Sequence, residues 1–340
     1  MSEYEVLQID PAQHKEGILK FWEDYLPGTP VGRFEWLNRG NPAGEAIWFF
    51  AFNRKNNDIA GVISIMPKEI TLKGRTMRGG ILGDFMVQSK YRVFGPNLLL
   101  PKTVLSRLSN KGLNFFYTVP NLKSEEIMKR VGFNKAGVMY SLVKVIRTRH
   151  YLNKYLNFFA GHCISPFADV CLRTISRETY VSGAGVFEET AVIDDPFDFL
   201  WQRVKFQQPQ MMGDHSPSYI RWRYLQNPLH KFRVLTYKKE SNGDLLGFIV
   251  FTIERERLYI FDIIALERTY INRLLKKVIS IGMKEYCVSI CIDVFETNPL
   301  LPLLKSFGFL NARSDIPIYS FGGENVLFQD CRFFGGDRNI

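Results

Sequence analysis

The sequence predicts an α+β fold in which two tandem domains each carry a mixed, mostly antiparallel sheet flanked by helices. Three observations lead to this prediction. The chain has 340 residues, which suits two domains of about 150 residues each. The same landmarks occur twice along it, which indicates a duplication. Each copy runs in the order helix, three strands, helix, strand, helix, strand.

The first landmark is a helix that ends at an Asn-Pro pair. The stretches "FEWLNRGNP" at residues 34–42 and "IRWRYLQNP" at residues 220–228 each place a tryptophan five residues before the asparagine. Proline lacks a backbone N–H, and its ring clashes with the preceding turn of a helix. We therefore expect Pro42 and Pro228 to end these two helices.

Two strands with matching residues follow in each copy. A glycine lies twenty residues after the asparagine, Gly61 within "IAGVISI" and Gly247 within "LLGFIVF". The next strand carries an aspartate, Asp84 in "LGDFMV" and Asp262 in "IFDIIA". The interval from glycine to aspartate is 23 residues in the first copy and 15 in the second. The first copy should therefore have the longer hairpin.

A long helical segment and a further strand come next in each copy. That strand ends in an asparagine, Asn121 or Asn298, and a short helix then runs into a Gly-Phe pair at residues 132–133 or 308–309. Five landmarks in the same order, with three near-equal spacings, predict that the chain arose by duplication.

The repeat sets the expected domain boundaries. We expect an N-terminal domain at residues 1–148 and a C-terminal domain at residues 191–340. Residues 149–190 belong to neither copy and are expected to form a helical connector packed between the domains. A membrane-surface helix is the alternative, which a polar face that is not strongly basic disfavours.

Composition limits the class of partner. The net charge is +10, which favours anionic partners such as phosphorylated ligands. The Lys and Arg residues are scattered, which disfavours a dedicated nucleic-acid surface. The five cysteines form no C-x-x-C pair, and no metal site is expected. With no secretory leader and no apolar run of 18 residues, we expect a cytoplasmic protein without stable membrane insertion.

The first copy resembles the GNAT (Gcn5-related) acyltransferases. The resemblance rests on the strand with Asp84, a following Tyr-Arg, a turn with Gly95, a long helix, and the Asn121 strand that leads to a helix and Gly-Phe. The phosphate loop of that family reads [QR]-x-x-G-x-[GA]. Here it reads Arg92-Val93-Phe94-Gly95-Pro96-Asn97, so the arginine and first glycine match and Asn97 replaces the final small residue.

The resemblance implies that this loop holds the pyrophosphate of a coenzyme A thioester. Gly95 suits the N-cap of the helix and Pro96 its first position. Free N–H groups and the helix dipole at a helix start attract anions. The resemblance also implies that the strand at residues 85–87 separates from its neighbour and binds the pantetheine arm, with Asn121 close by. The expected coenzyme-binding residues are Phe85, Met86, Val87, Arg92, Val93, Phe94, Gly95, Asn97, Leu98 and Asn121.

The implied reaction is direct attack of a primary amine on the thioester, with the N–H of Met86 or Val87 facing the oxyanion. Asp84 is a candidate base, but Asp262 occupies the same place in a copy without the loop, so a structural role is the alternative. In the family a tyrosine of the final helix often acts as the proton donor, and Met128 occupies that position here. Tyr117 is a candidate substitute, or else a packing residue. Asn121 contacts the reactants or caps its own turn.

The second copy has no glycine where the loop should be, and Glu267 there would repel phosphate. We therefore expect it to bind no coenzyme and to supply scaffold and an acceptor-binding surface. The acceptor is expected in a cleft between the domains. His215 and Arg223 are candidate acceptor-binding residues, with solvated or domain-packing roles as the alternative.

The tandem layout is similar to enzymes that acylate nucleotide-linked amino sugars for surface polysaccharide. The acceptor is therefore expected to be a small molecule, a nucleotide-linked amino sugar. The acyl group is expected to be acetyl or a longer chain. One alternative is an aminoacyl transferase that uses charged tRNA, which would need no coenzyme loop. Another is a non-catalytic binding protein. The sequence does not determine the oligomeric state.

Overall fold

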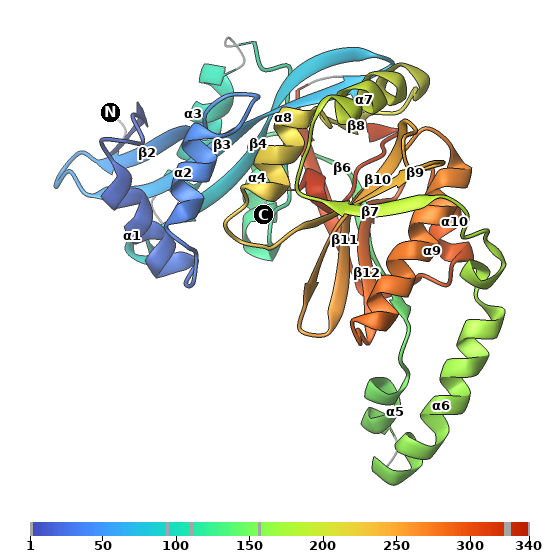
Figure 1. Cartoon of the computed structure of the whole chain (residues 1–340). Coiled ribbons are helices and arrows are strands. Elements are labelled where there is room, and N and C mark those ends of the chain that lie inside the picture. The colour runs from blue at the N-terminus through green and yellow to red at the C-terminus, as the bar shows by residue number, and fades with distance from the viewer. Residues whose placement is uncertain (1–2, 93–94, 109–111, 156–157, 323–327, 339–340) are drawn as a thin grey trace.

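The computed structural model describes residues 3–92, 95–108, 112–155, 158–322 and 328–338 (Figure 1). The first copy of the repeat contains six strands and four helices among these residues. They are β1 (Tyr4–Ile9), α1 (Lys15–Tyr25), α2 (Gly32–Arg39), β2 (Ile47–Asn53), β3 (Ile59–Leu72), β4 (Arg75–Val87), α3 (Pro96–Leu108), β5 (Phe115–Thr118), α4 (Leu122–Arg130) and β6 (Asn134–Val145).

The second copy repeats this order. Its elements are β7 (Val186–Thr190), α7 (Asp195–Gln207), β8 (Met212–Gly213), α8 (Pro217–Ile220), a π-helical turn at Arg221–Leu225, β9 (Arg233–Lys238), β10 (Leu245–Glu254), β11 (Arg257–Ala265), α9 (Arg268–Lys284), β12 (Ser289–Phe295), α10 (Leu301–Ser306) and β13 (Leu310–Phe321). A short turn, η5 (Gly335–Asp337), lies near the C-terminus. This confirms the predicted fold class.

All thirteen strands of the described residues join in one continuous sheet, in which the short β8 pairs with β3 and lies off the main strand path. Its order is β1-β2-β3-β4-β5-β13-β6-β12-β11-β10-β9-β7. Within each copy the pairing is antiparallel except for one parallel pair, β4 with β5 or β11 with β12. The last strands are exchanged between copies, because β13 pairs with β5 and β6 pairs with β12. The copies at residues 1–148 and 191–340 therefore share one sheet.

Alternation along the strands builds a core on each face of the sheet. In β2, Phe50 lies in a core with Ile18 and Trp22 of α1. Its neighbour Phe49 lies in a separate core with Leu100 of α3. Successive side chains of a strand point to opposite faces, so one apolar strand serves both layers of helices.

The repeated glycines, Gly61 and Gly247, each allow close backbone packing in their own copy. A Cβ on Gly61 would lie 2.9 Å from the Met86 carbonyl and 3.0 Å from Leu100, and one on Gly247 would lie 2.8 Å from the Ile264 carbonyl and 3.0 Å from Leu274. Glycine therefore lets β3 and β10 each lie close to a neighbouring strand and helix.

The two repeated tryptophans meet between the copies. The rings of Trp36 and Trp222 stack with centroids 4.9 Å apart. Each indole N–H donates to the carbonyl of the other residue, at 2.7 Å from Trp36 and 2.9 Å from Trp222. Such reciprocal contacts are those expected where two similar units meet about a local twofold axis.

The connector differs from its expectation. Helices α5 (Arg149–Tyr155) and α6 (Phe158–Ile175) pack on each other and project away from the body of the protein, rather than packing between the copies (Figure 1). In the described part of the chain, no helix has the length and apolar character needed to cross a membrane.

Candidate functional site

A gap opens between β4 and β5 in the first copy. The parallel pairing of the two strands ends at Ile81 and Tyr117, whereas β4 continues to Val87. Beyond this point the Thr118 hydroxyl donates to the Leu82 carbonyl at 3.2 Å. The end of β4 therefore carries backbone groups that face away from β3 and that β5 does not pair.

A bulge at Asp84 starts this separation. The pairing of β3 with β4 shifts between Ser64–Gly83 and Val62–Met86, and Asp84 has a φ of +47°. Positive φ is uncommon for residues other than glycine. A bulge bends and twists its strand. The bend therefore turns the end of β4 away from β5.

The Asp84 carboxylate is buried and fully engaged. Its Oδ1 accepts hydrogen bonds from Arg33 at 2.7 Å and from the Trp22 indole at 3.1 Å. Its Oδ2 accepts from the Ser64 hydroxyl at 2.7 Å. These contacts join α1 and α2 to the bulge, and they favour the structural role for Asp84 over the role of base.

The predicted phosphate loop leads from β4 into α3. Gly95 has a φ of +105°, with open space where a Cβ would lie. Its carbonyl accepts from the N–H groups of Leu98 and Leu99. The Leu98 N–H, expected to bind phosphate, is therefore used within the turn. Among the described residues, no acceptor is found for the N–H groups of Gly95 and Asn97, which face the start of the helix.

Other predicted coenzyme residues surround the loop. Arg92 is exposed, and its Nε donates to the Val87 carbonyl at 3.2 Å. The Asn97 side chain donates to the Arg92 carbonyl at 2.6 Å. Met86 and Val87 have buried side chains that belong to opposite faces of the sheet, so only their backbone can face the gap. The last two predicted residues, Val93 and Phe94, lie outside the described part of the chain.

The equivalent gap in the second copy is filled by the chain itself. Pairing of β11 with β12 ends at Ile260 and Ile292. Beyond it, Phe334 bridges to Val294, and the Phe333 carbonyl accepts from the Phe295 N–H at 3.1 Å. This C-terminal segment, residues 328–338, takes the place between the strands. This segment would block a coenzyme there, in addition to the repulsion of phosphate expected from Glu267.

Comparison with solved structures agrees with this architecture. A conserved protein of unknown function from Enterococcus faecalis V583, a probable N-acyltransferase, matches with a TM-score of 0.69 at 12% identity over 96% of this chain and 74% of its own. A GCN5-related N-acetyltransferase from Anabaena variabilis matches with a TM-score of 0.67 at 13% identity, over 93% and 72%. This chain has a tandem GNAT fold.

A further relative of the tandem GNAT fold is the N-myristoyltransferase of Saccharomyces cerevisiae with bound myristoyl-CoA. It matches with a TM-score of 0.60 at 11% identity, over 95% of this chain and 79% of its own. No protein-family model and no curated protein sequence matches the chain. At these identities the likeness establishes the fold.

Asn121 lies at the start of α4, near the end of β5 in the GNAT domain. Its side-chain oxygen accepts from the N–H groups of Lys123 and Ser124, each at 3.0 Å. These bonds satisfy donors that a helix start leaves free. The contacts favour the cap over a role with the reactants.

Replacing Asn121 by alanine tests this assignment. We expect the free energy of unfolding to fall by about 1 kcal/mol, with coenzyme affinity unchanged. Urea denaturation and coenzyme titration of the same sample measure the two quantities. An affinity loss of about tenfold or more without a change in stability would assign Asn121 to the reactants instead.

Tyr117 lies in the core between the copies rather than in an open cleft. Its side chain is fully buried, and its hydroxyl donates to the Asp337 carbonyl at 2.7 Å. Burial raises the pKa of the Tyr117 hydroxyl. These contacts favour the packing role over the role of proton donor.

The Asp337 carboxylate forms a buried ion pair with Lys68 of β3. The Nζ–Oδ1 distance is 2.6 Å, and both side chains are almost completely buried. Burial alone would lower the pKa of Lys68, but the charge of Asp337 raises it above its usual value. This pair therefore fixes the C-terminal segment to the first GNAT domain.

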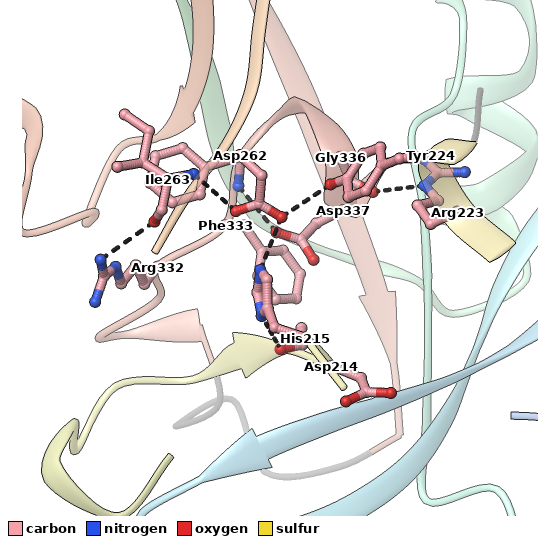
Figure 2. Close-up of polar contacts among 12 residues, drawn as sticks. Asp214, His215, Arg223, Tyr224, Asp262, Ile263, Arg332, Phe333, Gly336 and Asp337 are labelled. Atoms are coloured by element: carbon pink, nitrogen blue, oxygen red, sulfur yellow. Dashed lines mark hydrogen bonds and ion pairs between the residues drawn. The ribbon is translucent and has the colours of Figure 1, made fainter. Parts of the chain in front are cut away.

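His215 belongs to a second buried group in the centre of the molecule (Figure 2). Its Nε2 lies 2.7 Å from Oδ2 of Asp262, and its Nδ1 lies 2.8 Å from the Gly213 carbonyl. The Tyr224 hydroxyl donates to the same Oδ2 at 2.8 Å. Because both partners of the ring accept hydrogen bonds, both ring nitrogens carry protons and His215 is a cation.

The His215–Asp262 pair makes stability depend on pH. Burial alone would lower the pKa of His215, but Asp262 raises it overall. Burial alone would raise the pKa of Asp262, but His215 lowers it overall. The stabilisation is therefore complete between the ordinary aspartate and histidine values, about 3.9 and 6.5. It is lost as pH rises through the raised histidine pKa, and also as pH falls through the lowered aspartate pKa.

We expect the free energy of unfolding to fall above about pH 6.5, by about 1.4 kcal/mol for each unit of the histidine shift. Urea denaturation between about pH 5 and pH 9, applied to the wild type and to His215→Asn, measures this dependence. The variant should be less stable at the acidic end and lose the slope. Equal slopes in both proteins would contradict the assignment of the charge to His215.

Arg223 holds the C-terminal segment (Figure 2). Its side chain is fully buried, and its Nε donates to the Gly336 carbonyl at 3.0 Å and its Nη2 to the Arg338 carbonyl at 2.5 Å. It also lies over the Trp36 ring. The structure thus places His215 in buried contacts within the second GNAT domain, and Arg223 in buried contacts with the C-terminal segment and Trp36. These contacts favour a packing role for both residues over acceptor binding.

A cavity of 440 Å³ lies on the same face of the sheet as the C-terminal segment. Strands of both copies line it, with Ser141 on β6 and Tyr259 and Phe261 on β11. Gly335 and Arg338 of the C-terminal segment border it. No local pattern in the sequence marks this cavity, because it forms where the exchanged strands meet.

Charged side chains of both signs line this cavity. His230 contacts Glu254 at 2.6 Å, and Arg338 pairs with Asp293 at 2.7 Å. Arg257 also lines the cavity. In the described residues, no carboxylate or carbonyl partners its guanidinium. The cavity therefore offers a cation that is free to bind an anionic group.

Proposed function

We propose that this protein transfers an acyl group from a coenzyme A thioester to an amine. The observation that carries the proposal is the unpaired end of β4 beside the start of α3, where Gly95 has a positive φ. The fold of its neighbours supports it, and one of these is a transferase with bound myristoyl-CoA. Only the first copy keeps an open gap, so we expect one coenzyme per chain.

Binding of the thioester would use backbone groups above all. The pyrophosphate would meet Arg92 and the N–H groups of Gly95 and Asn97 at the start of α3, where the helix dipole favours negative charge. The pantetheine arm would extend along the open edge of β4. The thioester carbonyl would then lie near the N–H of Met86 or Val87, which can stabilise the oxyanion formed by amine attack.

The proton released by the amine would pass to water. The Asp84 carboxylate and the Tyr117 hydroxyl are already engaged in hydrogen bonds. The departing thiolate needs little help, since thiol pKa values lie near about 8.5. Catalysis would therefore come from positioning and from the oxyanion contact rather than from a strong acid or base.

Replacing Asp84 by asparagine tests this view of the proton. Asparagine can keep the contacts with Ser64 and the bulge, so we expect the acyl-transfer rate of the folded enzyme to stay within about threefold and the pH profile to keep its shape. A rate loss of about a hundredfold or more, with the disappearance of an ionisation from the profile, would make Asp84 the base.

The acceptor would bind in the cavity between the exchanged strands. An anionic group of the acceptor would pair with Arg257, and aromatic side chains such as Tyr259 and Phe261 offer contact to a ring. The net charge of +10 favours a phosphorylated acceptor. A nucleotide-linked amino sugar meets these requirements, and it remains our proposal for the substrate.

Mass spectrometry of reaction products tests the function directly. Purified protein would be incubated with several acyl-CoAs and a panel of amines, half of them amino-sugar nucleotides. We expect a product with the mass of the acylated amine and release of free coenzyme A. Arg257→Ala should raise KM for the acceptor and leave that for acyl-CoA unchanged. If the protein transferred an aminoacyl group from charged tRNA and no acyl group from any acyl-CoA, the aminoacyl transferase function would be favoured instead.

A further inference from the structure

In the described part of the chain, nothing covers the exposed side of the helical arm formed by α5 and α6. The two helices pack on each other and project from the side of the second copy (Figure 1). The base of the arm is fixed by Asp169, which accepts from the Thr148 N–H at 2.7 Å and from its hydroxyl at 2.8 Å. The arm is thus held out from the body in a defined position.

Large apolar side chains form a row along α6. Ile164, Phe167 and Val170 have exposed fractions of 47%, 78% and 58%. They recur every three residues, so they lie on neighbouring turns of one side of the helix. Isolated exposed apolar residues are ordinary, but a contiguous row on a projecting element marks a surface that binds something.

Two arginines lie near this row at the base of the arm. A hollow of 600 Å³ is lined by Arg147 and Arg149, by Pro166 of α6 and by the acidic residue Glu256. Asp169, which also lines it, is engaged with Thr148. The apolar row on α6 and the arginines at the start of α5 therefore lie at one end of the molecule.

The arm as a whole carries more basic than acidic residues, although no single polar face of it is strongly basic. Between residues 147 and 177 there is one acidic residue, Asp169. The basic residues of the same segment, besides histidines, are Arg147, Arg149, Lys154, Arg173 and Arg177. A second copy of the chain docking its arm here would bring these like charges together, which disfavours self-association.

We propose that the arm binds the surface of an anionic membrane. The apolar row of α6 would enter the boundary between headgroups and acyl chains, and the cations at its base would lie among the lipid phosphates. Such a helix lies in the interface and does not cross the bilayer, in keeping with the lengths of the described helices. The proposal is independent of the proposed acyl transfer, although it would bring the enzyme to acceptors held at a membrane.

Vesicle flotation of the full-length protein tests this proposal. Vesicles of phosphatidylcholine alone would be compared with vesicles that also contain phosphatidylglycerol. We expect flotation with the anionic vesicles, weaker flotation with the neutral ones, and a decline in binding as sodium chloride is raised, since salt screens the electrostatic part. Absence of flotation with both kinds of vesicle would overturn the proposal.

Matched variants separate the arm from the rest of the surface. Phe167→Asp should weaken binding at least about tenfold, whereas Phe199→Asp, at a residue 71% exposed on α7, should not. Arg149→Glu should weaken binding to anionic vesicles, whereas Arg75→Glu, the same charge change on the β3–β4 hairpin, should have far less effect. Equal binding by Phe167→Asp and the wild type would contradict the proposal.

A fluorescence reporter places the row in the bilayer. All five native tryptophans are buried, so the exposed Phe167→Trp reporter should dominate any spectral change. We expect its emission to shift to the blue when anionic vesicles are added. No shift on vesicles that bind the protein would show that another surface makes the contact. A concentration-dependent dimer that Phe167→Asp abolishes, without vesicle binding, would identify a second copy as the partner and overturn the proposal.

Discussion

Replacing Gly95 by aspartate is expected to weaken coenzyme A binding at least about a hundredfold. The reason is that an attraction between the helix start and the phosphates is replaced by repulsion between two negative charges. Gly95 lies at the start of α3, where the proposed pyrophosphate would contact the N–H groups. A carboxylate there places a negative charge against the phosphates. Open space surrounds the position of the new Cβ, so the fold should persist. Calorimetric titration with coenzyme A measures the loss.

Gly112→Asp is the matched control for this experiment. Gly112 also has a positive φ, +74° against +105° for Gly95, and a Cβ there meets no atom within 4 Å. Both variants introduce the same charge and a similar backbone strain, but Gly112 lies at the other end of α3. We expect unchanged affinity in this control. If Gly95→Asp also kept full affinity, the loop would not be the phosphate site.

Replacing Asp337 by asparagine is expected to lower the free energy of unfolding by about 3–5 kcal/mol. The substitution keeps the size of the side chain but leaves the buried Lys68 ammonium without its counter-charge. Both partners are almost completely buried, at 1% and 3% side-chain exposure, so water cannot take over the role of the carboxylate. Urea denaturation at neutral pH measures the change.

A second substitution decides whether the lost charge explains that result. Lys68→Met in the Asp337→Asn background removes the unpaired cation, and it should recover more than half of the lost stability. The exposed pair of Lys90 and Asp58 serves as the comparison, since Asp58→Asn should change the stability far less than Asp337→Asn does. A small effect of Asp337→Asn would mean that the C-terminal segment is not held by this ion pair.

The repeat was predictable from sequence because its landmarks depend on local geometry. Gly132 and Gly308 both have positive φ at a helix end, and the following phenylalanine in each copy donates its N–H to a carbonyl five residues before it. Only glycine adopts this conformation readily, so the Gly-Phe signal survives wherever the same helix end is needed.

The strand exchange was not predictable in the same way. The strands β6 and β13 end the two copies, and nothing in their alternation of residues says which copy supplies their neighbours. Pairing between strands is set by long-range contacts, such as Tyr319 opposite Thr118, that leave no local pattern. The sequence therefore predicts that a strand exists, but not its place in the sheet.

The burial of the candidate acceptor-binding residues was not predictable for a related reason. His215 and Arg223 stand in a polar stretch that resembles an exposed helix start. Their burial depends on partners far along the chain, since Asp262 lies 47 residues from His215 and Gly336 lies 113 from Arg223. One local signal existed in the glycine pair at residues 335–336, because such a pair often marks a backbone that lies close to another group. A Cβ on Gly336 would lie 2.0 Å from the Tyr224 hydroxyl.

The central claim is that the first GNAT domain, and not the second, binds coenzyme A. Calorimetric titration of the wild-type protein with coenzyme A tests it most directly. We predict saturable binding with one site per chain that Gly95→Asp abolishes and Gly112→Asp preserves. Absence of binding at millimolar coenzyme A, or a stoichiometry of two, would contradict the claim.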